Sequence, residues 1–211
     1  MKSKLSYTER VLNIWAIAMI AWSFYRAAFK ADLGLWFDEL VAKPVFFIVP
    51  VYIFITKFEK KKLLASIGLK AKSAWLEVLI GLVVGLGFLG SVVLLGNVQP
   101  YLDKKLLWLV IPALTTAITE VILSQGFVLE RLLKDSKGYI IPVIYASVLN
   151  FFLNVPLLFT TQGLTGTILM QVLVLQLSLN LALSFLYVYR RSVYAPIMIK
   201  FLYLLTVYTF M

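Results

Sequence analysis

The chain has 211 residues, of which 62% are hydrophobic and only 14% charged, and its mean hydropathy is +0.93. A soluble domain keeps roughly a quarter of its residues charged, so this composition indicates an integral membrane protein. The chain contains neither cysteine nor histidine. Disulfides, a thiol nucleophile and a cysteine-based metal site are therefore excluded, the commonest general base is missing, and any metal would have only oxygen ligands. We expect no cofactor.

Seven apolar stretches predict an all-α integral membrane protein, a bundle of about seven transmembrane helices. A spanning helix needs about 20 residues, so the second and seventh stretches are short or tilted, and the second lengthens if it begins at Leu35. Without a repeat or a linker, residues 1–211 are expected to form a single membrane domain. The stretches are approximately Val11–Phe29, Val45–Thr56, Ala74–Gly96, Leu106–Leu129, Tyr139–Phe159, Leu164–Tyr189 and Tyr194–Met211.

The basic residues predict how the chain is oriented. With a cytoplasmic N-terminus, 14 lysines and arginines fall on the cytoplasmic side and 5 on the other, while Lys200 lies inside the last stretch. This bias follows the positive-inside rule. We therefore attribute the net charge of +10 to a multi-pass protein of the cell membrane, with the lipid bilayer as partner and no nucleic acid. The five residues assigned to the outer side are Arg26, Lys30, Lys43, Lys104 and Lys105.

Residues 57–74 form the one sizeable cytoplasmic connection, "KFEKKKLLASIGLKAKSA". Its leucines and isoleucine are expected to face lipid and its lysines to face headgroups, as in an amphipathic segment that lies in the interface. In the following stretch, Glu77 is expected to reach the interface. The glycines at 81, 85 and 90 are expected to serve close helix packing.

Polar residues at bilayer depth are costly and therefore point to function. Thr116, Glu120 and Ser124 share one helical face at i, i+4 and i+8, with Gln125 adjacent. Three further groups lie in the last three stretches, and the amides of the sixth are interpreted as hydrogen-bonding groups between helices. These groups are Asn150 with Asn154, then Gln171, Gln176 and Asn180, and finally Lys200.

Glu120 and Lys200 lie at similar depth in the predicted bundle. Glu120 is 11 residues from Arg131, and Lys200 is 9 residues from Arg191. At 1.5 Å per residue, each charge is about 13–17 Å from the cytoplasmic boundary. Unpaired, each charge would be expensive to bury, so we predict that the two approach each other, directly or through Asn154.

Four segments in the right order resemble the CAAX-protease and bacteriocin-processing (CPBP, or Abi) family, which includes the type II CAAX prenyl endopeptidases. "ITEVILSQGFVLERLL" resembles its first motif, two adjacent glutamates followed by three residues, an arginine and usually a glycine. "SIGLKAKSAWLEVLIGLVVGLGF" resembles the helix before that motif, and "ASVLNFFLNVP" resembles its Phe-x-x-x-His helix. "SVYAPIMIKFLYLL" resembles its final His-x-x-x-Asn helix. The resemblance covers residues 63–207.

The functional positions of this family are altered in the chain. The resemblance implies a glutamate that activates water for peptide hydrolysis, with histidines and an asparagine that arrange the site. Glu120 matches the first glutamate, while Val121 stands in place of the second. The remaining family positions carry Gln125 for arginine, Asn150 and Asn154 for phenylalanine and histidine, and Lys200 and Leu204 for histidine and asparagine.

These replacements favour a relative without the usual protease activity. A neighbouring ammonium makes Glu120 a poorer base, so the pair becomes structural and the intramembrane cavity binds a peptide, a lipid, or a prenylated or membrane-protein partner. One alternative is an active, atypical glutamate endopeptidase of the CAAX or leader-peptide type. In it Glu120 is the base, and Asn154, Gln125 or Lys200 donates to the oxyanion. Lesser alternatives are a retinal-type Schiff base on Lys200 with Glu120 as counter-ion, and a transporter.

Overall fold

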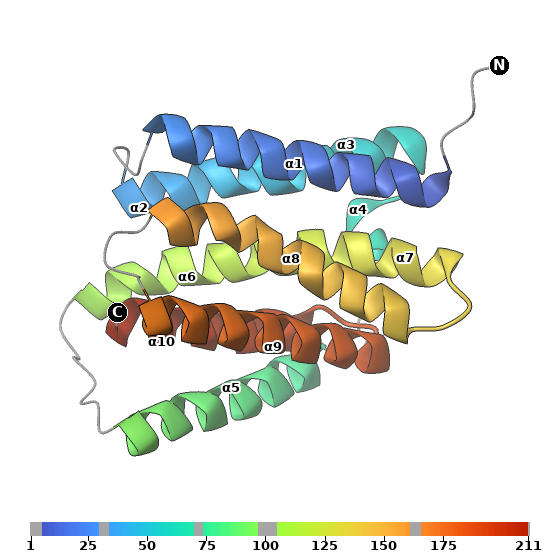
Figure 1. Ribbon diagram of the computed structural model, residues 1–211. Coiled ribbons are helices and arrows are strands. Elements are labelled where there is room, and N and C mark those ends of the chain that lie inside the picture. Colours follow the sequence, from blue (N-terminus) through green and yellow to red (C-terminus); the bar gives the residue numbers. More distant parts are fainter. Residues whose placement is uncertain (1–5, 30–33, 70–73, 97–104, 161–165, 211) are drawn as a thin grey trace.

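The computed structural model describes residues 6–29, 34–69, 74–96, 105–160 and 166–210. Within these ranges the chain is helical and has no strand, and its long helices lie side by side in one bundle (Figure 1). The elements are α1 Tyr7–Phe29, α2 Gly34–Phe37, η1 Asp38–Ala42, η2 Pro44–Ile48, α3 Val49–Ile53, η3 Phe54–Phe58, α4 Leu63–Ser66, α5 Ala74–Gly96, α6 Lys105–Val121, η4 Ile122–Leu129, α7 Glu130–Asp135, α8 Ile140–Thr160, α9 Gly166–Arg190 and α10 Tyr194–Phe210.

The predicted all-α membrane fold is confirmed. Among the described residues, four helices are long and apolar enough to cross a membrane, and three shorter helices are also apolar. α1 begins at one end of the bundle and α10 ends at the opposite one (Figure 1), whereas the side on which the N-terminus lies stays a prediction. The long spans are Tyr7–Phe29, Asp38–Phe58, Trp108–Asp135 and Val172–Arg190, and the shorter helices are Ala74–Gly90, Ile140–Val155 and Tyr194–Tyr208.

The second span is longer than Val45–Thr56 and agrees with the predicted alternative that begins at Leu35. It runs without interruption from α2 to η3, because the π-helical turns η1 and η2 carry the chain through Pro44. In these turns the backbone N–H of Lys43 donates to the carbonyl of Asp38, five residues earlier. The placement of Lys43 in an outer connection was therefore wrong, since its side chain is 2% exposed inside the bundle. Arg26 is also buried and pairs with Asp38.

A rod made of α6, η4 and α7 occupies the centre of the bundle (Figure 1). η4 is wound as a π-helix, in which the N–H of Glu130 donates to the carbonyl of Gln125. Ile67 packs directly against this turn at Gly126. A Cβ added at Gly126 would lie 2.9 Å from the Ile67 carbonyl oxygen. The expectation that the leucines and isoleucine of residues 57–74 face lipid therefore fails at Ile67, while residues 70–73 lie outside the described part of the structure. Leu64 is 62% exposed, but Ile67 is buried in the protein.

α5 packs on α10 through two glycines. A Cβ at Gly81 would lie 2.8 Å from the Ala195 carbonyl oxygen, and one at Gly85 would lie 2.6 Å from Leu202. Gly90 has no neighbour within 4 Å among the described atoms, so the predicted packing role fails there. Glu77 is buried by protein atoms, and its carboxylate lies 2.6 Å from the guanidinium of the partly exposed Arg190, while its position at the interface stays a prediction.

Candidate functional site

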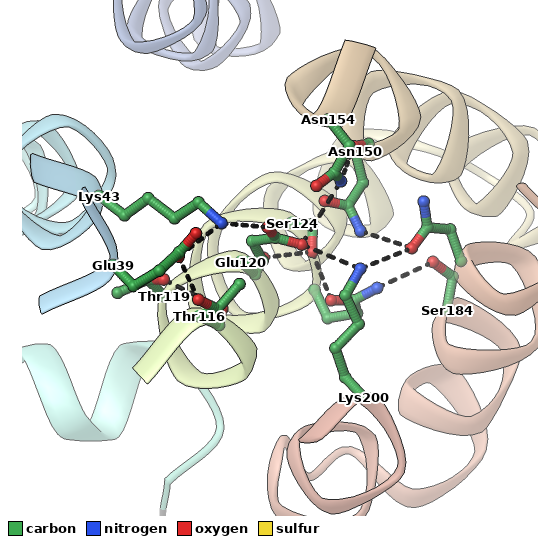
Figure 2. Close-up of polar contacts among 12 residues, drawn as sticks. Glu39, Lys43, Thr116, Thr119, Glu120, Ser124, Asn150, Asn154, Ser184 and Lys200 are labelled. Atoms are coloured by element: carbon green, nitrogen blue, oxygen red, sulfur yellow. Dashed lines mark hydrogen bonds and ion pairs between the residues drawn. The ribbon is translucent and has the colours of Figure 1, made fainter. Parts of the chain in front are cut away.

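Glu120 lies at the centre of a buried polar cluster, on the last turn of α6 (Figure 2). Its Oε1 is 3.2 Å from Lys43 Nζ, and its Oε2 is 2.9 Å from Lys200 Nζ. The side-chain amide of Asn154 also donates to Oε2, at 3.4 Å. The predicted approach of Glu120 and Lys200 is confirmed as a direct contact, while the described contacts of Asn154 join it to Glu120 and Asn150. Both side chains are 1% exposed or less.

The second ammonium at Glu120 comes from a residue that sequence reasoning did not consider for the site. Lys43 lies between η1 and η2, and its Nζ is 2.7 Å from the carboxylate of Glu39 one helical turn earlier. Glu39 also accepts a hydrogen bond from the Thr116 hydroxyl on α6. The ring of Trp22 lies 5.7 Å from Lys43 Nζ and covers it. The i, i+4 spacing of Glu39 and Lys43 is the sequence signal that could have found them.

Glu39, Lys43, Glu120 and Lys200 form a row of alternating charges, here named the charge chain (Figure 2). It contains two carboxylates and two ammonium groups, so its formal charges cancel. Charges withdrawn from water are costly unless each has an opposite partner and further hydrogen bonds. The alternation gives each inner member, Lys43 and Glu120, two opposite partners. The charge chain is therefore a self-compensating unit inside an apolar bundle.

Amide side chains complete the polar cluster on the Lys200 side. Asn180 Oδ1 accepts from Asn150 Nδ2 at 2.9 Å and from Lys200 Nζ at 3.4 Å. Asn154 Nδ2 also donates to the backbone carbonyl of Asn150, at 3.2 Å. The structure thus brings the predicted Asn150 and Asn154 to the site. The interpretation of Asn180 as a hydrogen-bonding group between helices is confirmed, since it joins α9 to α8 and α10, and the structure also places it at the site.

Two of the predicted positions do not reach the Glu120 carboxylate. The side chain of Gln125 accepts from the Ser124 hydroxyl and donates to Ser184 Oγ at 3.4 Å, so its described hydrogen bonds go to these two serines and not to Glu120 Oε1 or Oε2. Leu204 lies one turn after Lys200 on α10 and is buried in the apolar core. The side chain of Gln171 lies outside the described part of the structure, and Gln176 is buried on α9.

The contacts of Glu120 limit the chemistry available at this site, because most of the hydrogen-bonding positions on its carboxylate are occupied. A carboxylate offers about four lone-pair sites, and three donors already lie at its two oxygens. A general base must accept a proton from water within hydrogen-bond reach, and two adjacent ammonium groups oppose that step. In the described residues, no group of three or more histidine, cysteine, aspartate or glutamate side chains could hold a metal ion.

A family model matches part of the chain. Residues 102–206 match the family model described as type II CAAX prenyl endopeptidase, Rce1-like. The match includes Glu120 and Lys200 but not Glu39 or Lys43, so half of the charge chain comes from outside the matched region. No curated protein and no solved structure matches the chain.

Proposed function

Because residues 102–206 belong to the Rce1-like family of type II CAAX prenyl endopeptidases, we propose that this membrane protein keeps the family's helical scaffold without hydrolysing peptides at Glu120. In this proposal it acts by binding a peptide, a lipid or a membrane-protein partner. The observation that carries it is the double ammonium contact at Glu120, with Lys43 on Oε1 and Lys200 on Oε2.

The contacts of Lys200 are those of a structural cation. Its Nζ donates to Glu120 and to Asn180, and the side chain is completely buried. A buried ion pair persists when its geometry and extra hydrogen bonds offset the cost of desolvation. The second pair, between Glu39 and Lys43, makes Glu120 a member of a larger neutral assembly. A carboxylate whose two oxygens are held by ammonium groups stabilises the packing of the helices rather than transferring protons.

A cleavage assay tests the proposal. Purified protein is incubated with farnesylated CAAX peptides and with leader peptides, and the products are followed by mass spectrometry. We expect no cleavage by the unmodified protein or by Glu120→Gln, while binding of a labelled farnesylated peptide is retained by both. Cleavage that disappears in Glu120→Ala would contradict the proposal.

One geometric feature supports the atypical endopeptidase as the second candidate. Asn154 Nδ2 and Lys200 Nζ both approach Glu120 Oε2, so two donors stand beside the potential base, where an oxyanion would need them. This candidate predicts Glu120-dependent cleavage that increases in Lys43→Gln, because the variant withdraws one of the two cations from the base. If neither the unmodified protein nor Lys43→Gln cleaves the peptides, this candidate is excluded.

A further inference from the structure

The accessible basic side chains that the structure describes gather at one end of the bundle. This end holds the start of α1, the η3–α4 connection, the end of α7 and the junction of α9 with α10 (Figure 1). Hydrogen bonds join these pieces, from Tyr7 to Glu59 and from Arg191 to Glu130. We call it the basic end. Its cations are Arg10, Lys57, Lys60, Lys61, Lys62, Lys134, Lys137, Arg190 and Arg191.

Within the run of residues 57–62, the single acidic residue is directed inward. The carboxylate of Glu59 accepts two hydrogen bonds from the buried Arg131, at 3.0 and 3.1 Å, and a third from Tyr7. Its charge is therefore already balanced inside the protein. Lys61 approaches it only to 4.0 Å, and the part of the chain that the structure describes offers Lys57, Lys60 and Lys62 no ion pair.

The backbone displays these lysines on a fixed turn. Lys60 has a left-handed conformation with φ of 53°, and the N–H of Lys61 donates to the carbonyl of Ile55 at 3.2 Å, which ends the helix after Phe58. On the other side of the turn, Ile67 is anchored against Gly126. The exposed lysines are thus held between two buried attachment points, Arg131–Glu59 and Ile67–Gly126.

Large apolar side chains are exposed around the same turn. Phe58 is 65% exposed, and Leu64 is 62% exposed. Exposed aromatic and aliphatic groups beside lysines, at the end of spanning helices, are typical of the boundary between hydrocarbon and headgroups. A soluble acidic partner would match the charge but leave these apolar groups in water. Charge and apolar exposure together fit a lipid surface.

We propose that residues 57–64 bind the headgroups of anionic phospholipids. The lysines supply the charge, while Phe58 and Leu64 enter the acyl boundary. Basic residues near an anionic leaflet gain attraction that decays within about a Debye length, so binding must weaken with salt. This inference is independent of the proposed loss of proteolysis, because none of these residues touches Glu120 in the described contacts.

Lipid binding to the purified protein in neutral detergent tests this site. Fluorescent phosphatidylglycerol and phosphatidylcholine are titrated against the unmodified protein and against Lys60→Gln/Lys61→Gln/Lys62→Gln. We expect preference for phosphatidylglycerol, loss of that preference at high salt, and roughly fivefold weaker binding for each lysine removed. The control is Lys30→Gln/Lys104→Gln/Lys105→Gln, which removes the same charge from positions next to the end of α1 and the start of α6. It should bind phosphatidylglycerol normally.

Three outcomes would overturn the proposal. They are equal binding of both lipids by the unmodified protein, equal weakening in the two triple variants, and tighter binding of a short RNA or an acidic peptide than of phosphatidylglycerol. The salt titration of the unmodified protein needs no variant, so the test survives if the lysine variant does not fold. The unfolding temperatures of both variants report on folding directly.

Discussion

Glu120 and Lys200, 80 residues apart in the sequence, form an ion pair of 2.9 Å in which neither side chain is more than 1% exposed. The pair joins α6 to α10 and ends a neutral chain of four charges. Breaking a buried pair from one side leaves an uncompensated charge, and that cost exceeds the net contribution of the pair itself.

Glu120→Gln and Lys200→Met should each lower the free energy of unfolding by about 3–5 kcal/mol. The double variant should lose less than the sum, because Glu39 and Lys43 remain as a neutral pair. Denaturant unfolding of the detergent-solubilised proteins measures the three values. Additive losses would show that the two residues do not stabilise each other.

Lys43→Met should destabilise the protein by a similar amount, about 3–5 kcal/mol, because Glu39 would lose the cation it pairs with and Glu120 would keep only Lys200. The matched control is Lys57→Met, on the same second span but exposed, which should change stability by about 0.5 kcal/mol or less. Equal unfolding curves for the two variants would contradict the buried position of Lys43.

Gly81→Ala should destabilise the packing of α5 on α10. The new methyl group would lie 2.8 Å from the Ala195 carbonyl oxygen, a backbone atom that cannot move aside without shifting α10, and overpacking costs about 1–3 kcal/mol. Gly87→Ala on the same helix has open space and should stabilise by about 0.5–1 kcal/mol. Thermal unfolding of both variants checks the opposite signs.

The contact between Glu59 and Arg131 should make stability depend on acid pH. Burial by itself raises the pKa of the Glu59 carboxyl, but hydrogen bonds from Arg131 and Tyr7 outweigh it and hold the pKa below its ordinary 4.5. The stabilisation is therefore fully present above pH 4.5 and is lost as the pH falls through the lowered value.

Unfolding temperatures of the unmodified protein and of Glu59→Gln measure this contribution. The two proteins should differ at pH 7 and converge as the pH falls below 4.5. Arg131→Gln should remove the same pH dependence. A difference that persists unchanged at the lowest pH would assign the effect to packing rather than to the charge of Glu59.

The sequence determined the membrane class, the all-helical fold and half of the charge chain. Apolar stretches of sufficient length locate helices, because the bilayer leaves the backbone no other way to satisfy its hydrogen bonds. Glu120 and Lys200 were visible because a charge inside an apolar run is too costly to be incidental. Their similar depth then predicted their contact.

Only the tertiary structure revealed the other half of the charge chain. Lys43 precedes Pro44, at the edge of the predicted stretch Val45–Thr56, which is too short to span a membrane. The sequence therefore placed Lys43 outside the span, whereas the π-helical turns extend that helix to Gly34. Hydropathy measures how apolar a segment is, but it does not show which side chains of a neighbouring helix contact that segment. The pairing of Lys43 with both Glu39 and Glu120, and hence the neutrality of the charge chain, depends on how the helices pack.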